Sequence, residues 1–84
     1  MFQVELLYAA IAVVERLGYE VRHENLGGHG GGLCELKGKK VLFVDLTQGP
    51  FEQLDVVLGA LRSDPRSAEL ELPKELRTLL SPRD

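Results

Sequence analysis

The sequence has little of what several large classes of protein require. It contains one cysteine and no tryptophan, and no apolar segment approaches the roughly 20 residues that span a bilayer. A single cysteine, Cys34, excludes an intrachain disulfide and is typical of a reducing compartment. Glu5, Glu15 and Arg16 interrupt the N-terminal apolar stretch, so no signal peptide is predicted. We therefore expect a soluble, cytoplasmic protein that does not bind membranes.

The sequence also has no excess of positive charge. The formal net charge is −3, and the closest basic cluster, Lys37, Lys39 and Lys40, is split by Gly38. Binding to duplex nucleic acid needs many phosphate contacts, and two Tyr and three Phe do not make a stacking platform. The sequence therefore predicts no nucleic-acid partner. A length of 84 residues and an apolar content of 44% indicate one folded domain, residues 1–84.

Apolar residues recur at helical spacing in two long segments. The first, residues 3–17, is followed by Gly18, a common residue after a helix C-terminus. The second, residues 51–63, has Pro50 near its first turn. We expect the following side chains to face the core: Val4, Leu7, Ala10, Ile11, Val14 and Leu17 from the first helix, and Phe51, Leu54, Val57, Leu58 and Leu61 from the second.

The C-terminal half adds two expectations. Gly59, in the middle of the second helix, costs about 1 kcal/mol relative to Ala, so we expect a neighbouring element to approach it closely. Residues 69–72 are predicted to be short and extended, and Pro73 to open a last helix, Lys74 to Leu80. We expect this helix to dock on the core through Leu76, Leu79 and Leu80.

Three segments have the pattern of strands: residues 19–25, 33–37 and 40–46. The first alternates between apolar and charged residues, as a half-exposed strand does. The second and third are joined by a short hairpin turn at residues 37–40. Because residues 41–44 are apolar on both faces, we place strand 40–46 at the centre of the sheet. The sequence thus predicts an α+β domain in the order α-β-β-β-α-α, whose three-stranded sheet is packed by the two long helices.

Five of the nine glycines lie within Gly27–Gly32, between two predicted strands. Glycine loses much backbone freedom on folding, so such a cluster is either a mobile loop or a backbone held close against another group. Phosphate-binding loops also follow strands, but here no G-x-G-x-x-G or G-x-x-x-x-G-K-[ST] pattern is complete and no helix opens after the loop. If the loop contacts a ligand or partner, the candidate residues are Gly28, His29, Gly30 and Cys34.

Histidine and cysteine raise two further hypotheses, a metal site and a thiol nucleophile. His23, His29 and Cys34 are available, with Glu24 and Asp45 near them in the sequence, but the paired spacing of zinc ligands is missing. Cys34 with either histidine supplies the residue types of a nucleophile and a base. Alternation places Cys34 on an apolar strand face, so we expect a small buried side chain instead. No catalytic, cofactor or metal residue is therefore assigned.

Three segments resemble the zinc metallopeptidase domain of the ImmA/IrrE type, which cleaves repressor proteins. They are residues 15–21 (ERLGYEV), 39–45 (KKVLFVD) and 50–53 (PFEQ). In that family a helix carrying H-E-x-x-H follows. With Gly59 aligned to the glycine of its H-E-x-G-H variant, Val56 and Ala60 occupy the histidine positions and Val57 that of the general base. Aliphatic side chains cannot ligate zinc, so the resemblance implies a degenerate domain without peptidase activity.

The chain also resembles a group of small bacterial proteins, and this second resemblance implies no activity. The shared features are a G-G-x-C strand, a K/R-G-K/R hairpin and a late L-P-x-x-L-R-x-L-L segment, found here at residues 31–34, 37–39 and 72–80.

Two hypotheses of function follow. The first is a non-enzymatic interaction module whose partner is another protein or a second copy of this chain. It rests on the lack of a complete catalytic motif, the broad apolar face of the first helix and sheet edges open to pairing. A component of a larger assembly belongs to the same class. The alternative is a small metal- or ligand-dependent enzyme, with the Gly27–Gly32 loop closing over a site near His29 and Cys34.

Overall fold

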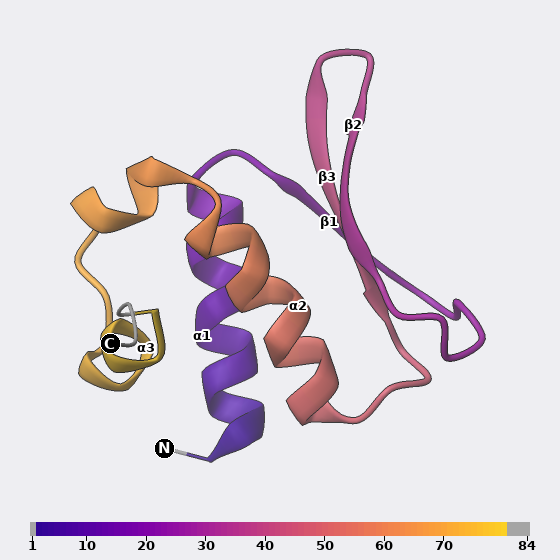
Figure 1. Ribbon diagram of the computed structural model, residues 1–84, viewed down its shortest axis with the longest axis horizontal. Coiled ribbons are helices and arrows are strands. Elements are labelled where there is room, and N and C mark those ends of the chain that lie inside the picture. Colours follow the sequence, from indigo (N-terminus) through magenta and orange to yellow (C-terminus); the bar gives the residue numbers. More distant parts are fainter. Residues whose placement is uncertain (1, 81–84) are drawn as a thin grey trace.

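The computed structural model describes residues 2–80, which form one layer of helices and one sheet (Figure 1). In chain order the elements are α1 (Gln3–Arg16), β1 (Glu20–Glu24), β2 (Gly32–Leu36), β3 (Lys39–Asp45), α2 (Pro50–Arg62), the 3-10 helix η1 (Pro65–Glu69) and α3 (Lys74–Leu80). The α+β class and the predicted order of helices and strands are confirmed, with η1 as an additional short element.

The central strand of the sheet is β3, as predicted. β1 pairs with it in parallel, with Glu20 opposite Val41, and β2 pairs with it antiparallel, with Leu36 opposite Lys39. Because β1 and β2 lie on opposite sides of β3, the chain that connects them crosses the end of β3. The glycine-rich segment makes this crossing.

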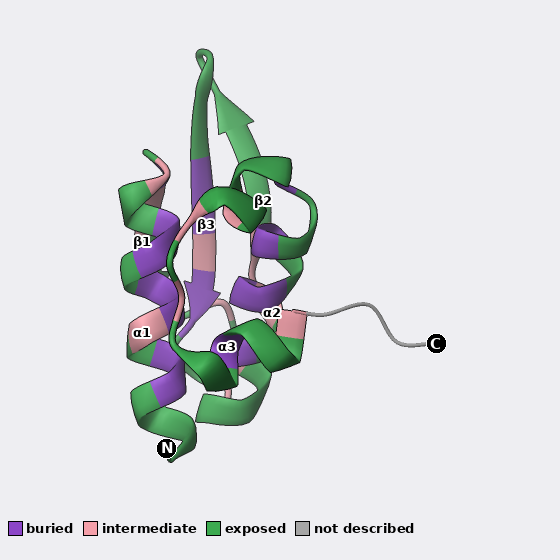
Figure 2. Ribbon diagram, turned by 90° about the vertical axis from the view of Figure 1, so that its left-hand side faces the viewer, coloured by how far each residue is buried: buried purple, intermediate pink, exposed green. Residues whose placement is uncertain are grey.

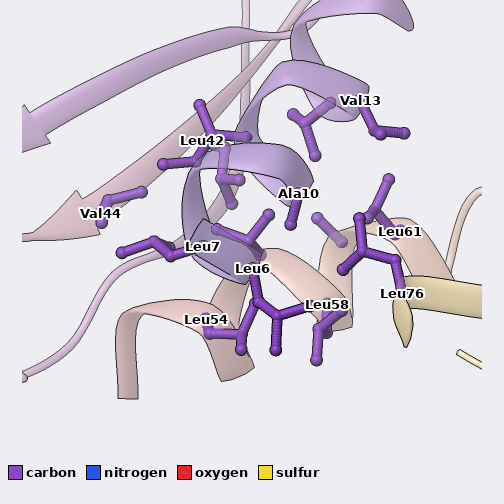
Figure 3. Close-up of a cluster of buried hydrophobic side chains, with 14 of the residues drawn as sticks. Leu6, Leu7, Ala10, Val13, Leu42, Val44, Leu54, Leu58, Leu61 and Leu76 are labelled. Carbon is purple, nitrogen blue, oxygen red and sulfur yellow. The ribbon is translucent and has the colours of Figure 1, made fainter. Parts of the chain in front are cut away.

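Both long helices pack against one face of the sheet (Figures 1 and 2). Leu42 and Val44 of β3 are fully buried in the core beneath the helices, and Figure 3 shows the cluster that they join. The helices contribute Leu6, Leu7, Ala10, Ile11, Val13 and Val14 from α1 and Leu54, Val57, Leu58, Ala60 and Leu61 from α2. Each large aliphatic side chain buried in this way stabilises the fold by about 1.5–3 kcal/mol. Within residues 2–80, no helix covers the other face of the sheet.

Two predicted core residues are not in the core. Val4 is 45% exposed and Phe51 is 61% exposed. Each lies in the first turn of its helix, and the two first turns lie at the same end of the helical layer (Figure 1). Helical periodicity identifies the inward side of a helix, but it does not show how far the neighbouring elements extend to cover it.

The segment after α2 also differs from the prediction. Residues 65–69 form η1, whereas an extended segment was expected from residue 69. Asp64 accounts for the difference, because its side chain accepts a hydrogen bond from the backbone N–H of Arg66 and so begins the short helix. In α3, Leu76 is fully buried as predicted, while Leu79 is 37% exposed.

The prediction that a neighbouring element packs closely on Gly59 is wrong. A Cβ atom placed on Gly59 would have no neighbour within 4 Å beyond the helix itself, and the residue is exposed.

We therefore expect Gly59→Ala to raise the free energy of unfolding by about 0.5–1 kcal/mol, because alanine has the higher helix propensity. Urea denaturation checks this, and a destabilised variant would show that the space at Gly59 is needed.

Candidate functional site

One buried carboxylate, that of Asp45, holds the chain segment that crosses the end of β3 between β1 and β2. Asp45 is the last residue of β3. Its side chain is 1% exposed. Four backbone N–H groups donate to it at 2.9–3.1 Å, those of Leu26, Gly28, Gly30 and Thr47. The hydroxyl of Thr47 donates a fifth hydrogen bond at 2.7 Å. The glycine-rich segment is therefore bound to the end of the central strand.

The topology explains why the carboxylate meets this segment. β1 and β3 are parallel, so Glu24 and Asp45, their last residues, lie side by side. The chain continues from Glu24 past the end of β3 and enters β2 on the other side, where Gly32 lies opposite Phe43. The backbone amides of the crossing segment have no strand to pair with, and Asp45 supplies the acceptors they need.

Two opposing effects set the ionisation of Asp45. Burial alone would raise its pKa, because it disfavours the charged form. The hydrogen bonds from Thr47, Leu26 and Gly30 outweigh burial and hold the pKa of Asp45 well below its ordinary value. Asp45 is thus a carboxylate at neutral pH with its oxygens fully engaged, which suits an anchor and not a proton donor.

One glycine of the segment is required by close contact. A Cβ atom on Gly31 would lie 1.7 Å from the carbonyl oxygen of Phe43, a backbone atom that cannot move aside. Gly28 and Gly30 have positive φ angles of 83° and 80°, which other residues rarely adopt. Of the two interpretations of the glycine cluster, the structure supports a backbone held close against another group.

The four residues that the sequence suggests as contacts for a ligand or partner have different surroundings in the structure. Gly28 and Gly30 donate their amides to Asp45, so these groups are not open to an external anion. His29, between them, is exposed. Cys34 lies on β2, where it borders a shallow depression together with Gly30, Gly31 and Phe43. The depression is open to solvent, and His29 is not among its lining residues.

The expectation that Cys34 is buried is wrong. Cys34 is exposed, and so are its neighbours Leu33 (44%) and Leu36 (46%). Cys34 and Leu36 do lie on one face of the strand, as the alternation predicts. That face is the one that the helices leave uncovered, and β2 is at the edge of the sheet.

The outer edge of β2 has backbone groups without a strand partner in the described chain. Lys37 and Gly38 form a two-residue turn with positive φ at both positions, the geometry of a tight hairpin. In such a hairpin the pair that flanks the turn is hydrogen-bonded, and bonded and non-bonded pairs alternate from there. The N–H and C=O groups of Leu33 and Glu35 therefore point away from β3.

The uncovered face of the sheet has a charged half and an apolar half. On β1, Arg22 forms ion pairs with Glu20 (3.6 Å) and Glu24 (3.3 Å). The guanidinium carbon of Arg22 also lies 5.8 Å from the ring centroid of Phe43 on β3. These exposed ion pairs add little stability, but they leave β1 hydrated. The apolar half is formed by Phe43 and the exposed side of β2.

A second buried carboxylate, Asp64, lies in a separate polar cluster. It is 4% exposed, accepts a hydrogen bond from the hydroxyl of Tyr19 at 2.8 Å and pairs with Arg66 at 2.7 Å. The hydrogen bonds from Arg66 and Tyr19 hold the pKa of Asp64 well below its ordinary value. Burial and the bond to Asp64 raise the pKa of Tyr19. These groups fix η1 to the start of β1 and offer no proton at neutral pH.

Sequence reasoning did not identify either carboxylate as an anchor. The sequence does contain a signal for the role of Asp45, because Asp45 is the charged residue that ends an apolar strand and Thr47 follows two positions later. Asp64 had a weaker one, as the residue before Pro65 at the end of a helix.

Metal and membrane sites have no support among residues 2–80. No group of three or more His, Cys, Asp or Glu side chains within that range could hold a metal ion. No helix there has the length and apolar content to cross a bilayer. Val57 and Ala60, which the resemblance to the ImmA/IrrE family would align with the general base and a zinc ligand, are fully buried and 6% exposed, respectively. Both belong to the core that α2 forms with the sheet.

Comparison of the chain with models of protein families, with curated proteins and with solved structures finds no match. The resemblance to the metallopeptidase domain therefore stays an interpretation of sequence pattern, and the function has to be argued from the geometry.

Neighbouring glycines test the close contact in the crossing segment. We expect Gly31→Ala to lower the free energy of unfolding by more than about 2 kcal/mol, because the new methyl group overlaps the Phe43 carbonyl. Gly32→Ala is the matched control, since a Cβ there has no neighbour within 4 Å. It should change stability by less than about 0.5 kcal/mol. Equal effects in urea denaturation would contradict the close contact.

The Asp45 anchor predicts a pH dependence. A carboxyl whose pKa is lower in the folded than in the unfolded chain stabilises the fold above its unfolded pKa and loses that contribution as pH falls. Stability should therefore decline from about pH 5 downward. We expect Asp45→Asn to be less stable at pH 7 and to show a shallower decline in acid, because one of the two depressed carboxyls, Asp45 and Asp64, is gone.

Urea midpoints at pH 7 and pH 3 measure this difference, with the exposed Asp55→Asn as the control variant. Amide hydrogen exchange should also accelerate at Leu26, Gly28 and Gly30 in the Asp45 variant. Unchanged exchange at these three amides would show that the carboxylate does not hold the segment.

Proposed function

We propose that this chain is a non-enzymatic interaction module that binds a protein partner along strand β2. The observation that carries the proposal is the outer edge of β2, where the backbone groups of Leu33 and Glu35 point away from the sheet and the side chains of Leu33, Cys34 and Leu36 are exposed. An exposed edge strand is a template for another strand, and neighbouring apolar side chains add affinity.

The charge distribution favours β2 over β1 as the binding edge. β1 carries Glu20, Arg22 and Glu24, and charged side chains are a common means of keeping an edge strand from pairing. β2 carries a single charged residue, Glu35, which lies directly opposite Lys40 of β3. A partner strand on β2 would therefore cover apolar side chains without separating an ion pair.

The glycine-rich segment supports β2 in this role. Its close contact with the carbonyl of Phe43 fixes the chain immediately before Gly32, the first residue of β2. The edge strand is thus held in place before a partner arrives, which reduces the entropy lost on binding. The hypothesis of an enzyme whose loop closes over His29 and Cys34 gains no comparable support, because the loop amides bind Asp45.

The test compares capture of proteins by three tagged forms of the chain in its native host: wild type, Leu36→Lys and Phe51→Lys. Leu36 and Phe51 are both exposed and apolar, but Phe51 lies in the first turn of α2 and not on a strand of the sheet. After cross-linking, we expect a protein that wild type and Phe51→Lys capture equally and that Leu36→Lys captures at least several-fold less. The species then has to bind the purified wild-type chain directly.

Untagged copies of this chain count as such a species. Capture that does not differ among the three forms, or that is lost with Phe51→Lys and kept with Leu36→Lys, would contradict binding along β2.

A further inference from the structure

We propose that the partner is a second copy of this chain, paired antiparallel through β2 about a two-fold axis at Cys34, so that two three-stranded sheets become one of six strands. This inference rests on the proposed function and names the partner of that surface. The five residues of β2, Gly32–Leu36, have Cys34 at their centre. Complete antiparallel overlap of two such strands therefore places one Cys34 beside the other.

The directions of the backbone groups allow this register. Leu33 and Glu35 carry the outward N–H and C=O groups, and in the complete overlap Leu33 of one copy lies opposite Glu35 of the other. These residues then exchange backbone hydrogen bonds, and the Cys34 pair between them is of the non-hydrogen-bonded kind. A shift that centres the axis on Glu35 would instead place two carboxylates opposite each other, which is unfavourable.

Side-chain volumes are complementary in the same register. Leu36, exposed on the uncovered face, lies opposite Gly32 of the second copy, where a Cβ atom would meet nothing within 4 Å. A leucine side chain can cover this bare backbone and reach Phe43, which lies directly beside Gly32 on β3. The two-fold axis produces this contact twice. An apolar side chain that covers a glycine in a neighbouring strand is a known source of sheet stability.

Face-to-face stacking of two sheets is a less favourable way for two copies to meet. The ion pairs of Glu20, Arg22 and Glu24 occupy half of the uncovered face and would have to be desolvated. Pairing through β2 leaves them in water. It covers only two short strands, so we expect a weak dimer with a dissociation constant of roughly 1–100 µM.

Charge variants at Leu33 test both the dimer and its register. In the proposed pairing this position lies opposite Glu35 of the second copy, so Leu33→Lys creates two attractions and Leu33→Glu creates two repulsions. Both variants replace one half-exposed leucine by a long charged side chain, and each is therefore the control for the other. We expect the dissociation constant of Leu33→Glu to exceed that of Leu33→Lys by about tenfold or more.

Sedimentation equilibrium across a concentration series measures these constants, in 0.15 M salt to screen the net charge of −3 on each copy. Wild type should approach twice the chain mass of 9.3 kDa at the highest concentrations. The double variant Leu33→Glu/Glu35→Lys should restore the dimer, because it exchanges the two charges. Thermal unfolding of each variant shows whether the monomer remains folded.

Cross-linking through Cys34 gives an independent measurement of the register. Opposed Cα atoms in a non-hydrogen-bonded pair are about 4.5 Å apart, within the range that a disulfide spans. Diamide, a diazene oxidant, is reduced to its hydrazine by the two protons and two electrons released when two Cys34 thiols form a disulfide. We expect wild type to form a covalent dimer rapidly. Leu36→Cys in a Cys34→Ser background should not, because its two thiols are about 14 Å apart along the strands.

The outcomes separate the two proposals. A chain that stays monomeric at roughly 500 µM, while a different protein binds it in a Leu36-dependent manner, overturns the self-pairing and leaves the proposed function standing. A dimer that responds equally to Leu33→Lys and Leu33→Glu, or that forms disulfides faster through position 36 than through Cys34, also overturns the self-pairing. Failure of both the dimer and the Leu36-dependent capture overturns both proposals.

Discussion

The structure depends on the hydrogen bonds between the Asp45 carboxylate and the chain that crosses the end of β3. The strand order β1-β3-β2 requires a connection from one side of the central strand to the other, and that connection cannot pair with any of the three strands. Its amides would be left without acceptors at a partly buried position. A carboxylate with two oxygens and several acceptor directions can bind three of these amides and both donors of Thr47 at once.

In this arrangement the glycine-rich segment has a different role from that of many glycine-rich loops. In a phosphate-binding loop, the backbone amides are arranged around an external anion. Here the same kind of donors surround an anion that belongs to the chain, the Asp45 carboxylate. The amides of Leu26, Gly28 and Gly30 are hydrogen-bonded to it and cannot also bind an external anion. The segment fixes β2 in place, and we propose the strand that follows it, β2, as the binding surface. The proposal of an interaction module depends on this difference.

Much of the fold could be predicted because its causes are local. The periodicity of α1 and α2, the apolar content of residues 41–44 and the turn at Lys37 and Gly38 each determine an element and its approximate bounds. What could not be predicted depends on contacts between elements distant in the sequence. The alternation of residues 33–36 predicts the strand face of Cys34, but whether that face is covered depends on both helices packing on the opposite side. Asp45 and Asp64 could be read as strand and helix ends, whereas their roles as anchors require the tertiary structure.

The parallel pairing of β1 with β3 has a consequence for the order of assembly. β2 and β3 are adjacent in sequence and form a hairpin by local contacts, while β1 can join only after the chain between Glu24 and Lys39 has closed into a loop. On the ribosome, α1 and β1 emerge before the strand against which β1 pairs has been synthesised. The N-terminal third of the chain therefore stays unpaired until the hairpin of β2 and β3 has formed. β1 is then the last strand to join the sheet.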